Sequence, residues 1–150
     1  NDRRWETRVD IRKIDDSISV APQIAIEDVA EIARLGFRTL VANRPDHEEY
    51  GQPAMADIEA AAREQGLEWV YMPVESGNIT DQDVERFAPM IRDAEKPVLA
   101  FCRSGTRCTV LWALSSARDH QPEEILSRAR NAGYDITGLI PRLMQQAGKR

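Results

Sequence analysis

The stretch KPVLAFCRSGTRCTVLWAL, residues 96–114, decides the fold of this chain of 150 residues. A continuous apolar run over 97–101 ends at Cys102, and a turn-forming segment then leads into a second apolar segment. An apolar run bounded by proline and a turn is typical of a strand that is buried on both faces of a parallel sheet. We therefore predict a central strand over 97–101, a tight loop, and a long helix from about Gly105 to Ala117.

Segments on both sides of this stretch alternate in the same way. We predict strands over 9–14, 18–22, 37–42 and 67–74, and helices over 27–35, 54–66, 81–94, 121–133 and 139–147. Strands that alternate with helices indicate a single α/β domain in three layers, with a central, mostly parallel sheet flanked by helices. The first two strands resemble a hairpin, and we expect this pair at the edge of the sheet.

Several predicted helices carry recognisable end signals. Thr80 and Asp83 form a capping-box pattern before one helix, although Asp replaces the usual Glu. Gly36 suits the end of another helix, and Pro122 suits the first position of a third. Pro89 lies inside a predicted helix, where it predicts a kink or an early break.

The length and charge of the chain limit its organisation and its partners. A single domain of this length buries about 68–70% of its unfolded surface. We expect an N-terminal extension over residues 1–8, one domain over 9–146 and a tail over 147–150. The net charge is −5, with acidic and basic residues interspersed, which argues against nucleic acid as a partner. No apolar run approaches the roughly 20 residues of a membrane-spanning helix, so we expect no membrane partner.

The cysteines and histidines exclude further classes of protein. Two cysteines do not make a disulfide framework, and the charged start carries no visible secretory signal, so we expect a cytoplasmic protein. His47 and His120 lie far apart, without ligand partners at metal spacing. We therefore predict no metal and no cofactor.

The loop that begins at Cys102 is the predicted site. Ligands of open α/β sheets bind beyond the carboxyl ends of the strands, where this loop lies. Its N–H groups can turn inward to bind an anion at a helix N-terminus, helped by the flexible backbone of Gly105 and the forked side chain of Arg107. The same field favours a thiolate, so we expect the pKa of Cys102 to lie below the usual value of about 8.5. The predicted anion-binding loop comprises Arg103, Ser104, Gly105, Thr106, Arg107 and Cys108, with Cys102 and Arg107 as catalytic residues.

A less specific interpretation of these residues competes with the catalytic one. A lone cysteine at a strand end is usually a small core residue, but two arginines and a glycine at fixed offsets favour a reactive thiolate. The polar loop NRPDHEEYGQP, residues 43–53, is expected at the same edge of the sheet, where Asn43 and Arg44 orient either the substrate or other side chains of the site. Charged loops are more often simply solvated, and that alternative stays open for Arg44.

The site loop resembles those of two families of cysteine enzymes. Protein tyrosine and dual-specificity phosphatases have five residues between the cysteine and the arginine, whereas many single-domain rhodaneses have the pattern Cys-x-x-Gly-x-Arg. The segment CRSGTR, residues 102–107, has four intervening residues and therefore matches the rhodanese length and its glycine. Phosphatases also usually carry Ser or Thr after the arginine, where this chain has Cys108.

A wider resemblance covers residues 9–146. The segment over 9–49, WVYMPV over 69–74 and PVLAFCRSGTR over 97–107 are similar to the bacterial beta-lactamase hydrolase-like family, also called DUF442. This resemblance implies a fold like that of dual-specificity phosphatases. It also implies either phosphatase or sulfurtransferase activity, and a fused or partner enzyme of sulfide oxidation.

The resemblance raises the question of a general acid. Dual-specificity phosphatases place an Asp after a PVED-like strand end, where it protonates the leaving oxygen. The matching stretch here is PVES, so that Ser76 occupies the position of the acid. The remaining candidates for an acid or for substrate contacts are Glu75, Asp46, Glu48 and Glu49.

Sulfur transfer needs no such acid, because sulfite and thiolate leaving groups need little protonation. We therefore predict a rhodanese-like sulfurtransferase, in which Cys102 takes sulfane sulfur from a small sulfur-containing anion or persulfide and carries it as its own persulfide. The first alternative is a phosphatase that acts on a phosphate ester through a phosphocysteine. The second alternative is a catalytically silent sensor of persulfides or anions. For Cys108 we favour packing in the core over a role as a resolving thiol.

Overall fold

The computed structural model describes residues 8–149, which form a five-stranded sheet with helices on both faces. The strands are β1 (Arg12–Lys13), β2 (Ile18–Ala21), β3 (Thr39–Ala42), β4 (Glu68–Tyr71) and β5 (Val98–Phe101). Their order is β1-β2-β5-β3-β4, and only the pair β1 and β2 is antiparallel. The mostly parallel sheet, the edge hairpin and the central strand buried on both faces are thus as predicted.

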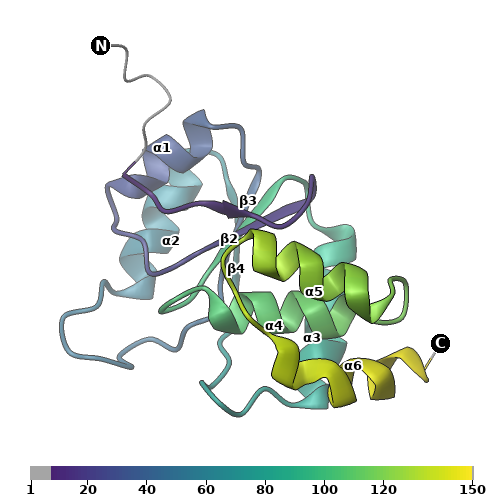
Figure 1. Ribbon diagram of the computed structural model, residues 1–150. Coiled ribbons are helices and arrows are strands. Elements are labelled where there is room, and N and C mark those ends of the chain that lie inside the picture. The colour runs from purple at the N-terminus through teal and green to yellow at the C-terminus, as the bar shows by residue number, and fades with distance from the viewer. Residues whose placement is uncertain (1–7, 150) are drawn as a thin grey trace.

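The helices divide between the two faces of the sheet, as Figure 1 shows. They are α1 (Asp28–Arg34), α2 (Met55–Glu64), α3 (Asp81–Asp93), α4 (Thr106–Ser116), α5 (Pro122–Asn131) and α6 (Ile140–Ala147), with a 3-10 turn, η1 (Thr137–Leu139), before α6. One apolar core lies between the sheet and α1 and α2, around Ile32 and Ile58. The other lies between the sheet and α3 to α6, around Phe87 and Leu111. The predicted three-layer arrangement is therefore confirmed.

Local end signals act largely as the sequence predicts. The capping box before α3 is formed, because the Asp83 N–H donates to Thr80 Oγ1 at 3.1 Å and the Thr80 N–H donates to Asp83 Oδ2 at 2.9 Å. Pro89 does not break α3, which continues to Asp93. The side chain of Phe87 is fully buried in the core that α3 shares with α4, and this packing outweighs the hydrogen bond that a proline removes.

The sheet brings the loops after β3, β4 and β5 to one edge. In the strand register, Ala21, Phe101 and Ala42 lie side by side at the carboxyl ends of β2, β5 and β3. The Cys102 N–H continues the pairing by donating to Ala21 O at 3.3 Å, and the Asn43 N–H donates to Phe101 O at 2.9 Å. The predicted 43–53 loop and the cysteine loop therefore start next to each other.

The predicted N-terminal extension and C-terminal tail contribute few described residues to the fold. The predicted N-terminal extension lies outside the described residues except for Arg8, as does Arg150 of the predicted tail. Lys149 lies 3.5 Å from a carboxylate oxygen of Asp81, which links the tail to the start of α3. Over residues 8–149, none of the helices has both the length and the apolar character needed to cross a membrane.

Candidate active site

The loop after β5 folds around the sulfur of Cys102. The Gly105 N–H lies 3.1 Å from Cys102 Sγ, and Gly105 has a φ of 92°, a conformation that favours glycine. The carbonyls of Arg103 and Ser104 are bonded from outside, by the Gln23 N–H at 3.1 Å and by the Tyr134 hydroxyl at 2.9 Å. A carbonyl and the N–H that follows it point in opposite directions across a trans peptide. The N–H groups after these two carbonyls therefore face the inside of the loop.

Cys102 is buried, yet its surroundings favour the thiolate. Its pKa is lowered to about 6, mainly because the Cys108 thiol donates a hydrogen bond to its sulfur, with smaller contributions from the N–H groups of Cys108, Gly105 and Arg107. Burial opposes this shift but does not cancel it. Burial and the neighbouring thiolate raise the pKa of Cys108 well above its usual value, so Cys108 stays protonated and can act as the donor. Packing, the role that we favour for Cys108, is therefore only part of what it does.

Arg107 is held so that one edge of its guanidinium stays available. Its Nη1 donates to Glu48 Oε2 at 2.8 Å and to Val74 O at 2.9 Å, and its Nη2 donates to Glu48 Oε1 at 2.8 Å. These bonds use three of the five N–H groups of the guanidinium. The other two, on Nε and Nη2, share one edge, and no acceptor within residues 8–149 bonds to Nε. That edge has the fork geometry that binds two oxygens of one oxyanion.

The 43–53 loop supplies the carboxylates that hold these arginines. Arg44 is buried and donates from Nε to Glu48 Oε1 at 2.8 Å, so that Glu48 lies between two guanidinium groups. Glu49 accepts from Arg44 at 3.3 Å and from the exposed Arg103 at 3.1 Å. Asn43 is also buried, and its Nδ2 donates to Met72 O at 2.8 Å. The positions of Asn43 and Arg44 favour support of the site over direct contact with a substrate.

A cavity of about 810 Å³ opens over the loop. Its wall includes Arg103, Ser104, Thr106 and Arg107 from the loop and the start of α4, Ser76 to Ile79 from the segment before α3, Val110 of α4, Leu139 of η1 and Arg142 of α6. The wall is thus partly apolar and carries three arginines. Among the described residues that line it, none is Asp, Glu or His. The cavity therefore suits an anionic ligand.

None of the four candidate acids lines this cavity. The carboxylate of Asp46 accepts from the Met55 N–H at 3.3 Å, at the start of α2. Hydrogen bonds from Arg107 and Arg44 lower the pKa of Glu48 to about 2, so Glu48 is ionised at neutral pH and cannot donate a proton. Glu49 is engaged by two arginines, and Glu75 lines a separate cavity with Pro45 and Asp83. Ser76, at the position of the usual acid, does line the main cavity.

Some residues of the site do not follow from sequence patterns. Tyr134 and Arg142 come from the last third of the chain and reach the loop and the cavity only through the packing of α5, η1 and α6. The polar character of the 43–53 loop indicates a role at the site, but not that Glu48 binds Arg107. Of the aromatic residues, Tyr50 is fully exposed and Trp112 packs in the core.

The sequence matches the model of the phosphatase-like domain of beta-lactamase hydrolase-like proteins over residues 10–119. A beta-lactamase hydrolase-like protein of Agrobacterium fabrum is 31% identical over 137 residues, and one of Xylella fastidiosa is 33% identical over 136 residues. These matches cover 90% and 89% of this chain but 32% of each relative. The chain thus spans about a third of the length of the curated relatives it matches.

Solved structures agree with this match. The structure of a candidate phosphatase of Neisseria meningitidis has a TM-score of 0.82 and 39% sequence identity, over 91% of this chain and 98% of that one. The catalytic core of the PP-IP phosphatase SIW14 of S. cerevisiae has a TM-score of 0.67 at 15% identity, over 94% of this chain and 85% of that one. The second likeness concerns the fold alone. Together they confirm the predicted fold of the cysteine-phosphatase type.

Proposed function

The chain belongs to the family of the phosphatase-like domain of beta-lactamase hydrolase-like proteins, and we propose from its site that it is a cysteine-dependent phosphatase that hydrolyses phosphate monoesters. The family match bears out the resemblance found in the sequence. It favours the phosphatase alternative over our main prediction of sulfur transfer, which the relatives do not support. The observation that carries the proposal is a thiol with a pKa of about 6 beside an arginine with one unoccupied edge, beneath a basic cavity.

The proposed reaction proceeds in two steps on the same sulfur. The thiolate of Cys102 attacks phosphorus, and the P–S bond forms while the bond from phosphorus to the leaving oxygen breaks, with its electron pair staying on that oxygen. Water then attacks the phosphocysteine, the P–S bond breaks, and the thiolate is regenerated. The protons of the water pass to the phosphate product and to the solvent. In both steps the inward N–H groups and the available edge of Arg107 stabilise charge on the phosphoryl oxygens.

The residues around the cavity also indicate which leaving groups the enzyme can use. A leaving alkoxide needs a proton from a general acid, and the described residues that line the cavity include no carboxyl group or imidazole. A leaving group that is itself a weak acid, such as a phenol or a phosphate, departs as an anion without that proton. We therefore expect the enzyme to favour aryl phosphates and phosphoanhydrides over alkyl phosphates.

A series of aryl phosphates tests this proposal. We expect turnover whose kcat/KM falls steeply as the pKa of the leaving phenol rises, because no acid compensates for a poorer leaving group. Cys102→Ser should remove turnover, and mass spectrometry of the quenched wild-type enzyme should detect phosphate on Cys102. If no aryl phosphate is turned over in a Cys102-dependent manner, the chain is not a phosphatase of this kind.

Sulfur transfer remains the second candidate because of one feature, the spacing of four residues between Cys102 and Arg107. The two functions leave different adducts on the same sulfur. Incubation with thiosulfate or glutathione persulfide, followed by mass spectrometry, would show an added sulfur atom on Cys102 if this candidate is correct. Catalytic transfer of that sulfur to cyanide or a thiol, without hydrolysis of aryl phosphates, would replace the phosphatase proposal. Absence of both activities would favour the silent sensor.

A further inference from the structure

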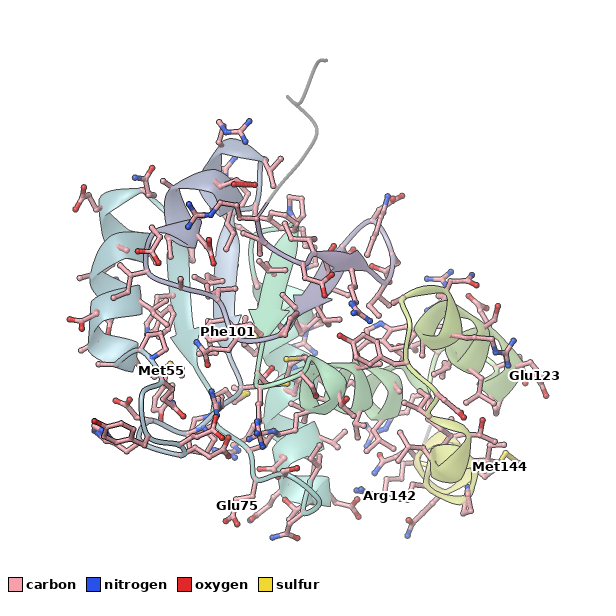
Figure 2. The ribbon with its side chains drawn as sticks, turned by 60° about the vertical axis from the view of Figure 1, so that its left-hand side comes forward. Met55, Glu75, Phe101, Glu123, Arg142 and Met144 are labelled. Atoms are coloured by element: carbon pink, nitrogen blue, oxygen red, sulfur yellow. The ribbon has the colours of Figure 1, made fainter. Side chains whose placement is uncertain are left out.

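The cavity over the cysteine loop has a second basic end, formed by Arg142. Figure 2 shows this side chain extending from α6 toward the segment that precedes α3. Its Nη1 donates to Ile79 O at 2.8 Å and its Nη2 donates to Asp81 Oδ1 at 3.1 Å. Two of its five N–H groups are used in this way, so Arg142 is fixed in place while it keeps donors for a ligand.

The charges around Arg142 do not cancel. Asp81 also lies 3.5 Å from Lys149 Nζ and accepts from Gln146 Nε2 at 3.1 Å. One carboxylate thus serves two cations, which leaves this end of the cavity with a net positive charge. At the other end, Arg44, Arg103 and Arg107 share the carboxylates of Glu48 and Glu49, which also leaves one positive charge. An anion bound near Arg142 therefore meets an uncompensated charge.

The space between the two ends suits the body of a small molecule. Ile79, Val110 and Leu139 supply apolar side chains to the wall of this cavity. Its volume of about 810 Å³ lies within the range of about 300–1,000 Å³ that is usual for small-molecule sites. A phosphoryl group at Cys102 leaves most of this volume for the rest of the substrate. Arg142 is placed to contact that remaining part.

We propose that Arg142 forms a second anion subsite, and that the substrate is a small phosphate compound whose leaving group carries a further anionic group. This inference rests on the proposed phosphatase function and specifies its substrate class. The phosphoryl group to be transferred binds at Cys102 and Arg107, the apolar wall covers the body of the leaving group, and its second anion binds Arg142. Arg142 lies beyond residues 10–119, the part that the family model matches.

Two substrates with the same leaving chemistry test the subsite by turnover. The probes are phenyl phosphate and 3-(phosphonomethyl)phenyl phosphate, which differ in the second anionic group. We expect wild-type kcat/KM to be about 10- to 100-fold higher for the second probe, the range that charge-assisted hydrogen bonds provide. Arg142→Gln should remove most of this preference, so that the kcat/KM values of the two probes approach each other. Arg142→Lys, which retains the charge, should keep part of it.

A matched control and a binding assay separate this inference from the proposed function. Arg63→Gln, an exposed arginine on α2 paired with Glu59, should leave both substrates unaffected. In Cys102→Ser, calorimetry with benzylphosphonate and 1,3-bis(phosphonomethyl)benzene measures the subsite without catalysis. Tighter binding of the bisphosphonate that depends on Arg142, without turnover of either substrate, would keep the subsite and overturn the phosphatase. Equal wild-type kcat/KM for both substrates, or equal losses for both in Arg142→Gln, would overturn the subsite.

Discussion

Glu48 holds the guanidinium of Arg107 through two hydrogen bonds of 2.8 Å, although the residues lie 59 positions apart in the chain. This pairing turns one edge of Arg107 toward Glu48 and leaves the Nε edge for a ligand. A carboxylate that occupies an arginine in this way does not compete with the substrate, because it uses the other edge. Glu48 is therefore a positioning residue, and the 43–53 loop acts on the reaction through Arg107.

Replacement of Glu48 by Gln tests this role. An amide can accept from only one Arg107 nitrogen, and its NH₂ group faces the other, so the guanidinium loses its fixed orientation. We expect kcat/KM for an aryl phosphate to fall about 10- to 100-fold, since small misplacements of catalytic groups have effects of this size. The pH midpoint set by Cys102 should stay at about 6. Glu49→Gln is the control, because Glu49 contacts Arg44 and Arg103 but not Arg107. Equal losses in both variants would contradict the assignment.

Glu48 should also make the stability of the protein depend on pH. Its pKa is about 2 in the folded protein and near its ordinary value of 4.5 in the unfolded chain, so only the unfolded chain takes up this proton between these values. The stabilising contribution is therefore complete above about pH 4.5 and is lost as the pH falls toward 2. Urea unfolding at pH 7, 4 and 3 measures the free energy of unfolding of wild type and of Glu48→Gln. The difference between the two should become smaller as the pH falls. A constant difference would show that Glu48 titrates alike in both states.

Cys108 is expected to control the ionisation of Cys102. In Cys108→Ala the strongest donor to the sulfur is lost, so the pKa of Cys102 should rise above about 6, whereas the hydroxyl of Cys108→Ser should keep it low. The rate of alkylation by iodoacetamide as a function of pH measures this pKa. The pKa of Cys108 is raised well above its usual value, so its thiol stays protonated and contributes little to the observed rate. An unchanged midpoint in Cys108→Ala would mean that backbone N–H groups alone stabilise the thiolate.

The sequence predicts the strands and helices that position this site better than it predicts the side-chain contacts within the site. The short apolar strands and the helix end signals are local patterns, and all five strands and the six α-helices occur where these patterns place them. The loop from Cys102 to Arg107 is also local, since strand, turn and helix follow one another directly. The partners of Glu48 and Arg142 depend on tertiary packing, and no periodicity indicates which arginine a carboxylate will meet. The main functional prediction, sulfur transfer, rested on the four-residue spacing and on the missing general acid, and the relatives support the phosphatase alternative better.

Gly105 should be essential for the backbone shape of the loop. Its φ of 92° is unfavourable for other residues, and an added Cβ would overlap the hydroxyl of Tyr134 and lie 2.9 Å from Tyr134 Cζ. We expect Gly105→Ala to lower kcat/KM more than about 100-fold and the free energy of unfolding by about 1–3 kcal/mol. Gly138→Ala is the control, because an added Cβ there meets nothing within 4 Å. Near-normal activity of Gly105→Ala would show that the loop adapts without its left-handed residue.

Ser76 offers the most direct test of the missing acid, because its position lines the cavity while Glu75 faces another one. Ser76→Asp would place a carboxyl group where related phosphatases carry their acid. Protonation of the leaving oxygen should raise kcat/KM for an alkyl phosphate about 10-fold or more, with little change for an aryl phosphate whose phenol is already acidic. The gain should decline as the pH rises and the new carboxyl group ionises, so the pH profile becomes bell-shaped between the ionisations of Cys102 and Asp. Ser76→Asn, similar in size but without a proton to donate, is the matched control. A gain of the same size in Ser76→Asn, or none in Ser76→Asp, would mean that the leaving group does not lie beside residue 76.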